Sequence, residues 1–170
     1  MNIPAIGPLE QHPAVPEWQS SGPVSVPLLN GDSLIFTFDS LTAEDEADVR
    51  SAIDAFLDLG SAARDEMGKY IFANYQRMAD MVSEEDLGCK ISEESEVWEY
   101  VHPTEIYVSR RHRGDQSIYI SISAECDWEV EHGLQMVFRR GERLSRVSDQ
   151  DGHLTHADAY DTPENEDKIA

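Results

Sequence analysis

One short stretch of the chain combines a thiol, an indole, an imidazole and several carboxylates. Its residues are Glu125, Cys126, Asp127, Trp128, Glu129, Val130, Glu131, His132 and Gly133. A second group of the same kind, Asp151-Gly152-His153, follows after two alternating strand patterns. Residue types like these support three different roles: a nucleophile with its base, a metal site, or a tightly built turn.

Cys126 and His132 are the candidate nucleophile and base, provided that the loop folds them together. A catalytic cysteine needs a pKa that is lowered by a cation or by a helix N-terminus. The sequence neighbours of Cys126 are acids, which would raise the pKa of its thiol instead. The local sequence therefore disfavours thiol catalysis.

A divalent metal would need ligands of mixed type, and the candidates are Cys126, His132, Asp151 and His153. The chain contains neither a CxxC nor an HExxH spacing. The segment 149–152 is only partly similar to a calcium-binding loop, because it lacks the third ligand before the glycine and the late glutamate. We therefore expect no bound metal and no cofactor.

A structural role explains more of these residues. Glu131 and His132 could hydrogen-bond backbone groups of a connection that turns between two strands. Gly133 suits a positive φ where the next strand begins. Trp128 could close one end of the core with its indole N–H bonded to a carbonyl, and Cys126 would then be a small buried apolar residue. We predict that this motif is mainly a folding device.

The patterns around the motif predict an antiparallel meander. Residues 97–101 and 105–109 are predicted as two short strands, separated by His102-Pro103-Thr104. The second of them is expected to pair with the alternating run 118–122. Residues 134–139 and 143–148 are expected to form another hairpin around Arg140-Gly141-Glu142.

The first half of the chain predicts a hairpin followed by two helices. Residues 24–29 and 33–38 flank Asn30-Gly31, a pair that supplies the positive φ angles of a type I′ turn. Thr42 and the acids after it predict the start of a helix, which Gly60 ends. Apolar residues at helical spacing predict a second helix over about 61–82. The fold class is therefore α+β, with an antiparallel sheet of five to seven strands and two helices on one face.

Three regions follow from composition. Residues 1–23 form a proline-rich N-terminal arm, residues 24–157 a single α+β domain, and residues 158–170 an acidic C-terminal tail that we expect to be disordered. We find no signal peptide pattern and no apolar stretch long enough to span a bilayer. With only two cysteines as well, the sequence favours a cytoplasmic location.

The chain is strongly acidic. Its 34 acids and 13 lysines and arginines give a net charge of −21, which disfavours binding to nucleic acid or to an anionic membrane and favours a basic protein partner. The acids that we expect to contact this partner are Glu84, Glu85, Asp86, Glu93, Glu94, Glu96 and Glu99. Seven arginines are concentrated instead in the strand region, where they either balance charge or form a docking surface: Arg110, Arg111, Arg113, Arg139, Arg140, Arg143 and Arg146.

The motif 126–134, followed by an apolar strand and 151–154, resembles a bacterial family of uncharacterised domains with a C-[DE]-W-x-x-E-H-G-L signature. The resemblance covers roughly residues 24–160. It brings no established activity, although related domains are suspected of being immunity-type proteins. We therefore expect a non-catalytic protein-binding domain, an immunity-type inhibitor of a toxin or effector. The alternatives are a metal- or thiol-dependent enzyme that uses the Cys126–His153 segment, and a structural or adaptor domain.

Overall fold

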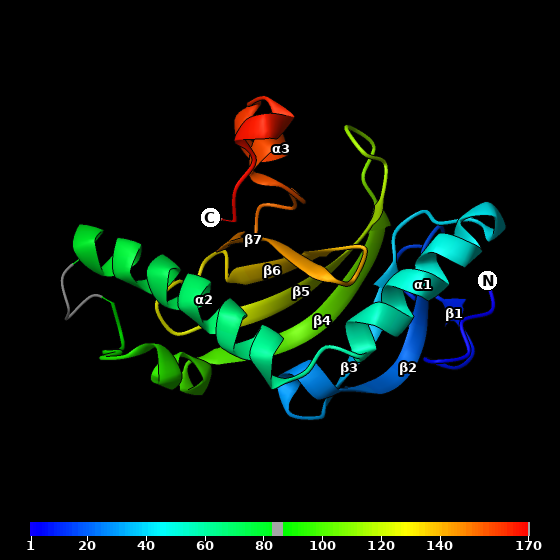
Figure 1. Cartoon of the computed structure of the whole chain (residues 1–170). Coiled ribbons are helices and arrows are strands. Elements are labelled where there is room, and N and C mark those ends of the chain that lie inside the picture. The colour runs from blue at the N-terminus through cyan, green and yellow to red at the C-terminus, as the bar shows by residue number, and fades with distance from the viewer. Residues whose placement is uncertain (83–86, 170) are drawn as a thin grey trace.

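A single seven-stranded sheet, with its strands in sequence order, carries two long helices on one face (Figure 1). The computed structural model describes residues 1–82 and 87–169. Neighbouring strands are antiparallel except β3 and β4, which are parallel because α1 and α2 lie in the connection between them. The predicted α+β class is confirmed, with seven strands; the parallel pair was not predicted.

The elements have the following bounds. The strands are β1 (Glu10–Gln11), β2 (Gln19–Val26), β3 (Asp32–Phe38), β4 (Val101–Arg110), β5 (Ile118–Cys126), β6 (Leu134–Arg139) and β7 (Arg143–Asp149). The α-helices are α1 (Glu46–Leu57), α2 (Ser61–Met81) and α3 (His156–Tyr160). Short 3-10 helices are η1 (Pro27–Leu29), η2 (Ala43–Asp45), η3 (Glu94–Glu99) and η4 (Glu164–Glu166).

Local signals in the first half of the chain act partly as predicted. The hairpin of β2 and β3 is present, but residues 27–29 of its predicted first strand form η1, and Val26 pairs with Asp32. The connection therefore spans residues 27–31 and is not the predicted two-residue type I′ turn, although Asn30 and Gly31 do have positive φ angles of 58° and 88°. The Thr42 hydroxyl accepts a hydrogen bond from the backbone N–H of Glu44, and the Asp45 carboxylate accepts one from the backbone N–H of Thr42. This reciprocal cap satisfies donors that the start of a helix leaves free.

Two predictions about the region before β5 are wrong. Residues 97–99 belong to η3 rather than to a strand, because Val97 is buried where η3 packs against α2. His102-Pro103-Thr104 does not break the next strand, since β4 runs without interruption through it. The register with β5 shifts between Pro103 and Glu105, and this irregularity accommodates a residue that has no N–H to donate.

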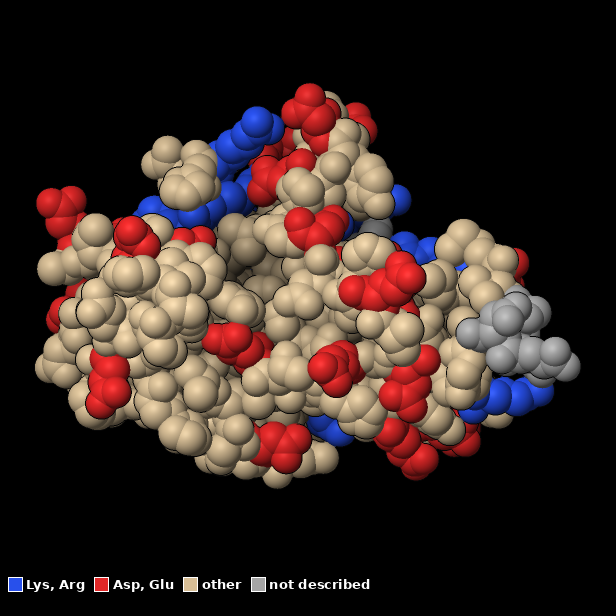
Figure 2. Space-filling view, turned by 180° about the vertical axis from the view of Figure 1, so that it is seen from behind, with Lys and Arg blue, Asp and Glu red and all other residues tan. Residues whose placement is uncertain are grey.

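The two faces of the sheet have different compositions. Ile120 and Ile122 of β5 belong to the core cluster that includes Ile53 and Phe56 of α1. The Phe56 ring also meets the Phe138 ring edge-on at 5.5 Å, which joins α1 to β6. The alternate side chains of the strands point to the opposite face, where polar groups dominate. On the side turned away from Figure 1, acids are scattered widely, and lysines and arginines gather mainly near the C-terminal segment (Figure 2).

Both ends of the chain pack onto the sheet. The boundary that we predicted at residue 23 lies inside β2, and Ile3 and Ile6 of the arm are buried. The expectation of a disordered tail needs correction, because residues 156–160 form α3, and Asp158 pairs with Arg111 of the strand region. In the parts of the chain that the structure describes, no helix is both long and apolar enough to cross a membrane.

Candidate functional site

Cys126 ends β5 and is nearly inaccessible, with 3% of its surface exposed. Its Sγ lies 3.7 Å from the carbonyl oxygen of Glu129. Burial is the main reason why the pKa of the thiol rises to about 12. A thiol with this pKa holds almost no thiolate at neutral pH, so the structure does not provide an activated nucleophile here.

A clamp built by Glu129 determines the shape of the turn after Cys126. Its carboxylate accepts hydrogen bonds from the backbone N–H groups of Glu131 at 3.0 Å and His132 at 3.1 Å, and lies 3.4 Å from the His132 Nδ1. Burial opposes ionisation, but these hydrogen bonds outweigh it and lower the pKa of Glu129. We assigned this backbone role to Glu131 and His132, and that assignment is wrong: the side chain of His132 is 64% exposed, and Glu131 is exposed as well.

Trp128 anchors the turn to α2. The side chain is 4% exposed, and its ring meets the Tyr75 ring edge-on at 5.7 Å. The indole N–H donates to the side-chain oxygen of Asn74 at 2.9 Å, and the Asn74 amide donates in turn to Asp149 at 3.2 Å. Trp128 thus closes the end of the core as predicted, although its partner is a side-chain amide rather than a backbone carbonyl.

Gly133 is required at the end of the turn for two reasons. Its φ is +68°, a region that other residues adopt at a cost. A Cβ atom at this position would also lie 2.6 Å from the carbonyl oxygen of Ala124 on the neighbouring strand. The predicted positive φ is therefore present, and the close approach of β5 adds a steric requirement.

The second motif group forms a separate turn beyond β7. Asp151 accepts two hydrogen bonds from the guanidinium of Arg146, both at 2.6 Å, and one from Gln135 at 3.1 Å. Arg146 and Gln135 also donate to the carbonyl oxygen of His153. Gly152, between the two, has a φ of +77°. Asp151 is therefore engaged by a buried arginine and shapes its own turn.

The candidate metal ligands are not brought together as a set. Asp151 is occupied by Arg146, and Cys126 is enclosed by its own turn. Over residues 1–82 and 87–169, no group of three or more histidine, cysteine or acidic side chains is arranged to hold a metal ion. Asp127, another motif residue, lies 3.1 Å from the His102 Nε2 at the start of β4, and this pair is about half exposed.

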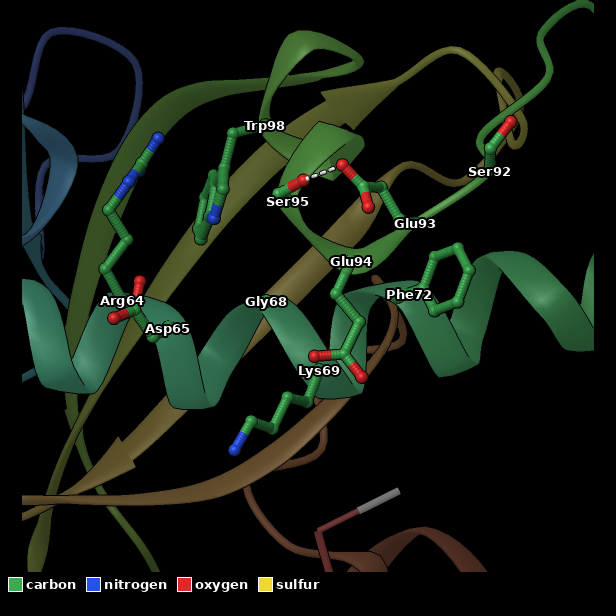
Figure 3. A pocket seen from close by; sticks show the side chains of 10 residues that line it. All are labelled: Arg64, Asp65, Gly68, Lys69, Phe72, Ser92, Glu93, Glu94, Ser95 and Trp98. Atoms are coloured by element: carbon green, nitrogen blue, oxygen red, sulfur yellow. Dashed lines mark hydrogen bonds between the residues drawn. The ribbon is translucent and has the colours of Figure 1, made fainter.

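A different site lies between α2 and the segment 92–98 (Figure 3). It is a groove of about 800 Å³. The residues that line it are Arg64, Asp65, Gly68, Lys69, Phe72, Ser92, Glu93, Glu94, Ser95 and Trp98. Gly68 is an interior helical residue, and a Cβ atom there would lie 3.4 Å from the Trp98 Nε1. That distance is an ordinary van der Waals contact, so Trp98 lies close over Gly68 but a methyl group would still fit.

The four predicted partner-binding acids that the structure describes lie in η3 or directly before it, next to this groove. Glu93, Glu94 and Glu99 are exposed and Glu96 is half-buried; none of the four forms an ion pair within the described part of the chain. Glu96 accepts from the backbone N–H of Ser92, and Glu93 from the Ser95 hydroxyl. The other three predicted acids, Glu84, Glu85 and Asp86, lie outside the described residues.

Sequence reasoning missed several residues that build these sites. Asn74 interrupts an otherwise apolar helical stripe, and that polar interruption was the available signal. The pairing of Arg146 with Asp151 had only a weak signal, five residues of separation across a turn. No signal in the sequence indicated the contact between Arg64 and Trp98, since the two residues lie on different elements far apart in the chain.

A family model described as Domain of unknown function (DUF6985) matches residues 5–154. Since the match covers most of the 170 residues, the chain belongs to this family. This confirms the inferred resemblance to an uncharacterised domain, and the match extends into the N-terminal arm. Comparisons with curated proteins and with solved structures gave no match.

Proposed function

We propose that this member of the DUF6985 family is a non-catalytic protein-binding domain, an immunity-type inhibitor that neutralises a basic toxin or effector. The observation that carries the proposal is the group of exposed acids Glu93, Glu94 and Glu99 beside the groove, which form no ion pair within the described residues. Carboxylates that pair with no internal cation in the described part of the chain are available to a basic partner. A net charge of −21 would accelerate the encounter with a basic surface.

The enzyme alternative receives less support. Burial holds Cys126 in its thiol form, and Asp151 is occupied by Arg146. Cys126 and Asp151 thus serve contacts within the fold, and the exposed His132 has neither of them as a partner for catalysis in the described structure. Both cysteines are free thiols, which fits the cytoplasmic location that we include in this proposal.

The test is the association kinetics with the product of a neighbouring effector gene, at low and at high salt. We expect association to slow as salt rises while dissociation changes little, because electrostatic steering acts on the encounter. The double reversal Glu93→Lys and Glu94→Lys should slow association without lowering the melting temperature.

The matched control is Glu10→Lys with Glu17→Lys. These two acids are also exposed, and their reversal changes the net charge by the same amount, at the other end of the molecule (Figure 1). If the two double variants slow association equally, only net charge matters, and the acids near η3 are not the binding surface. An association rate that changes neither with salt nor with the reversal of Glu93 and Glu94 would contradict the proposal.

A further inference from the structure

The groove between α2 and η3 already holds a guanidinium against an aromatic ring. The Cζ atom of Arg64 lies 3.8 Å from the centroid of the Trp98 ring, within the range of a cation–π contact. Burial is the main cause that lowers the pKa of Arg64. Arg64 forms no ion pair in the described structure, so the ring is its principal partner.

Ser95 lies on the other side of the Trp98 ring, with the acids of η3 and the residue before it beyond Ser95 (Figure 3). Figure 3 shows Arg64 on one side of the ring and Ser95 and Glu93 on the other, with Gly68 beneath it. Phe72 adds a second half-buried aromatic surface one helical turn further along α2. The groove therefore offers flat apolar surfaces next to carboxylates, with no bulky side chain at Gly68 to fill it.

Charge complementarity indicates what would occupy the groove. Asp65, Glu93 and Glu94 are the acids of its lining, and they outnumber its two cations, Arg64 and Lys69. All three acids are exposed without an ion pair in the described residues. An arginine suits such a site better than a lysine, because its planar guanidinium stacks on aromatic rings and binds carboxylates in a bidentate manner.

We propose that this groove is the docking site for an arginine-rich segment of the basic partner, with an arginine side chain inserted between Trp98 and the carboxylates of Glu93 and Glu94. The inference rests on the proposed function and adds the recognition chemistry to it. Arg64 is then an internal competitor. It places a positive charge beside the position that the partner's arginine takes, and its removal strengthens binding.

The test uses an oligoarginine peptide and an oligolysine peptide of the same length as probes. The readout is the indole N–H resonance of Trp98 in proton–nitrogen correlation NMR. The variant Trp98→Phe identifies this resonance, because the chain has only 3 tryptophans. We expect oligoarginine to shift the Trp98 resonance and to bind severalfold more tightly than oligolysine.

Arg64→Ala should raise the affinity for oligoarginine severalfold. The matched control is Arg77→Ala, which removes the same charge from an exposed position of α2 outside the groove. It should change the affinity much less. Glu94→Gln should weaken the binding of oligoarginine, and the melting temperatures of all the variants verify that they are folded.

Equal affinities for the two peptides, an unshifted Trp98 resonance, or equal effects of Arg64→Ala and Arg77→Ala would overturn the groove inference. The proposed function fails by a different result, namely an effector association that is insensitive to salt and to the Glu93 and Glu94 reversal. The two failures are therefore distinguishable.

Discussion

Two acidic regions of the molecule use their carboxylates in opposite ways. In the region that includes the motif turns and the C-terminal segment, acids face arginines: Asp151 pairs with Arg146, and Asp158 with Arg111. In the segment 93–99, the acids are exposed, apart from the half-buried Glu96, and have no such partner in the described structure. The acids of the first region are paired within the fold, and those of the second are the ones that we propose contact a basic partner.

Two arginines of the strand region, Arg110 and Arg111, show how acids are paired within the fold. Arg111 is 3% exposed, and its guanidinium donates to Asp158 and to Glu164 at distances between 2.5 and 2.9 Å. Arg110 pairs with Asp45 and with an acid on α1. Internal charge balance therefore accounts for these two arginines, and a docking role for them is not needed. A buried charge without a partner would be costly, so the contacts of Arg111 with Asp158 and Glu164 also order the tail.

The largest expected effect is the loss of stability when a tryptophan is truncated, and this loss should differ between the two regions. Trp128→Ala should lower the free energy of unfolding by roughly 3–5 kcal/mol, because it empties a fully packed site and leaves Asn74 without its donor. Trp98→Ala, in the half-buried groove, should cost clearly less. Denaturant unfolding of both variants measures the difference. His132→Ala should also destabilise the fold, but less than Trp128→Ala, since its side chain is mostly exposed. Equal losses at both tryptophans would contradict the comparison.

The next effect concerns an acid that the fold uses. Asp158→Asn should cost roughly 1–3 kcal/mol, because Arg111 stays buried with one fewer charged partner. The bonds from Arg111 are the largest influence that lowers the pKa of Asp158 below its ordinary 3.8. A lowered pKa gives stabilisation that is present above the unfolded value and is lost as pH falls through the folded value.

The wild-type protein should therefore lose stability as the pH decreases below about 4, and Asp158→Asn should flatten that loss. Melting temperatures measured across this pH range check the sign. A variant that loses stability on acidification as steeply as the wild type would show that the Arg111 pair does not link folding to pH.

The two cysteines give a chemical comparison, because Cys126 lies in the motif turn and Cys89 precedes the segment 93–99. Cys126 is buried with a pKa of about 12, whereas Cys89 is only half-buried, although burial raises the pKa of its thiol too. Iodoacetamide should modify Cys89 in the native protein and Cys126 only after unfolding, as peptide mass spectrometry would reveal. Rapid native labelling of Cys126 would restore the possibility of a reactive thiol.

The smallest expected effect is the change in stability when Glu93 and Glu94 are neutralised. Glu93→Gln combined with Glu94→Gln should change the free energy of unfolding by less than about 0.5 kcal/mol, which is typical of exposed sites without strong contacts. Thermal melts beside Asp158→Asn provide the comparison. A loss as large as that of Asp158→Asn would mean that the fold does need these acids.

Local sequence determined those parts of the fold that depend on neighbouring residues. Asn30-Gly31 marked the hairpin, Thr42 marked the helix start, and alternation marked β5 and β6. The positive φ of Gly133 was also predictable, because a turn between two strand patterns requires one. These features depend on backbone preferences and on periodicity, which the sequence displays directly.

Only the tertiary structure decided which charges are used and which are free. Whether Asp158 belongs to a disordered tail or to an ion pair depends on Arg111, 47 residues away. Whether Val97 lies in a strand depends on the packing of η3 against α2, where Val97 is buried, and no local pattern displays that packing. In the sequence the acids near η3 and those of the tail look alike. In the described structure they differ because Asp158 and Glu164 of the tail contact the buried Arg111, whereas the acids near η3 contact no such cation. Pairing across long separations leaves no local pattern.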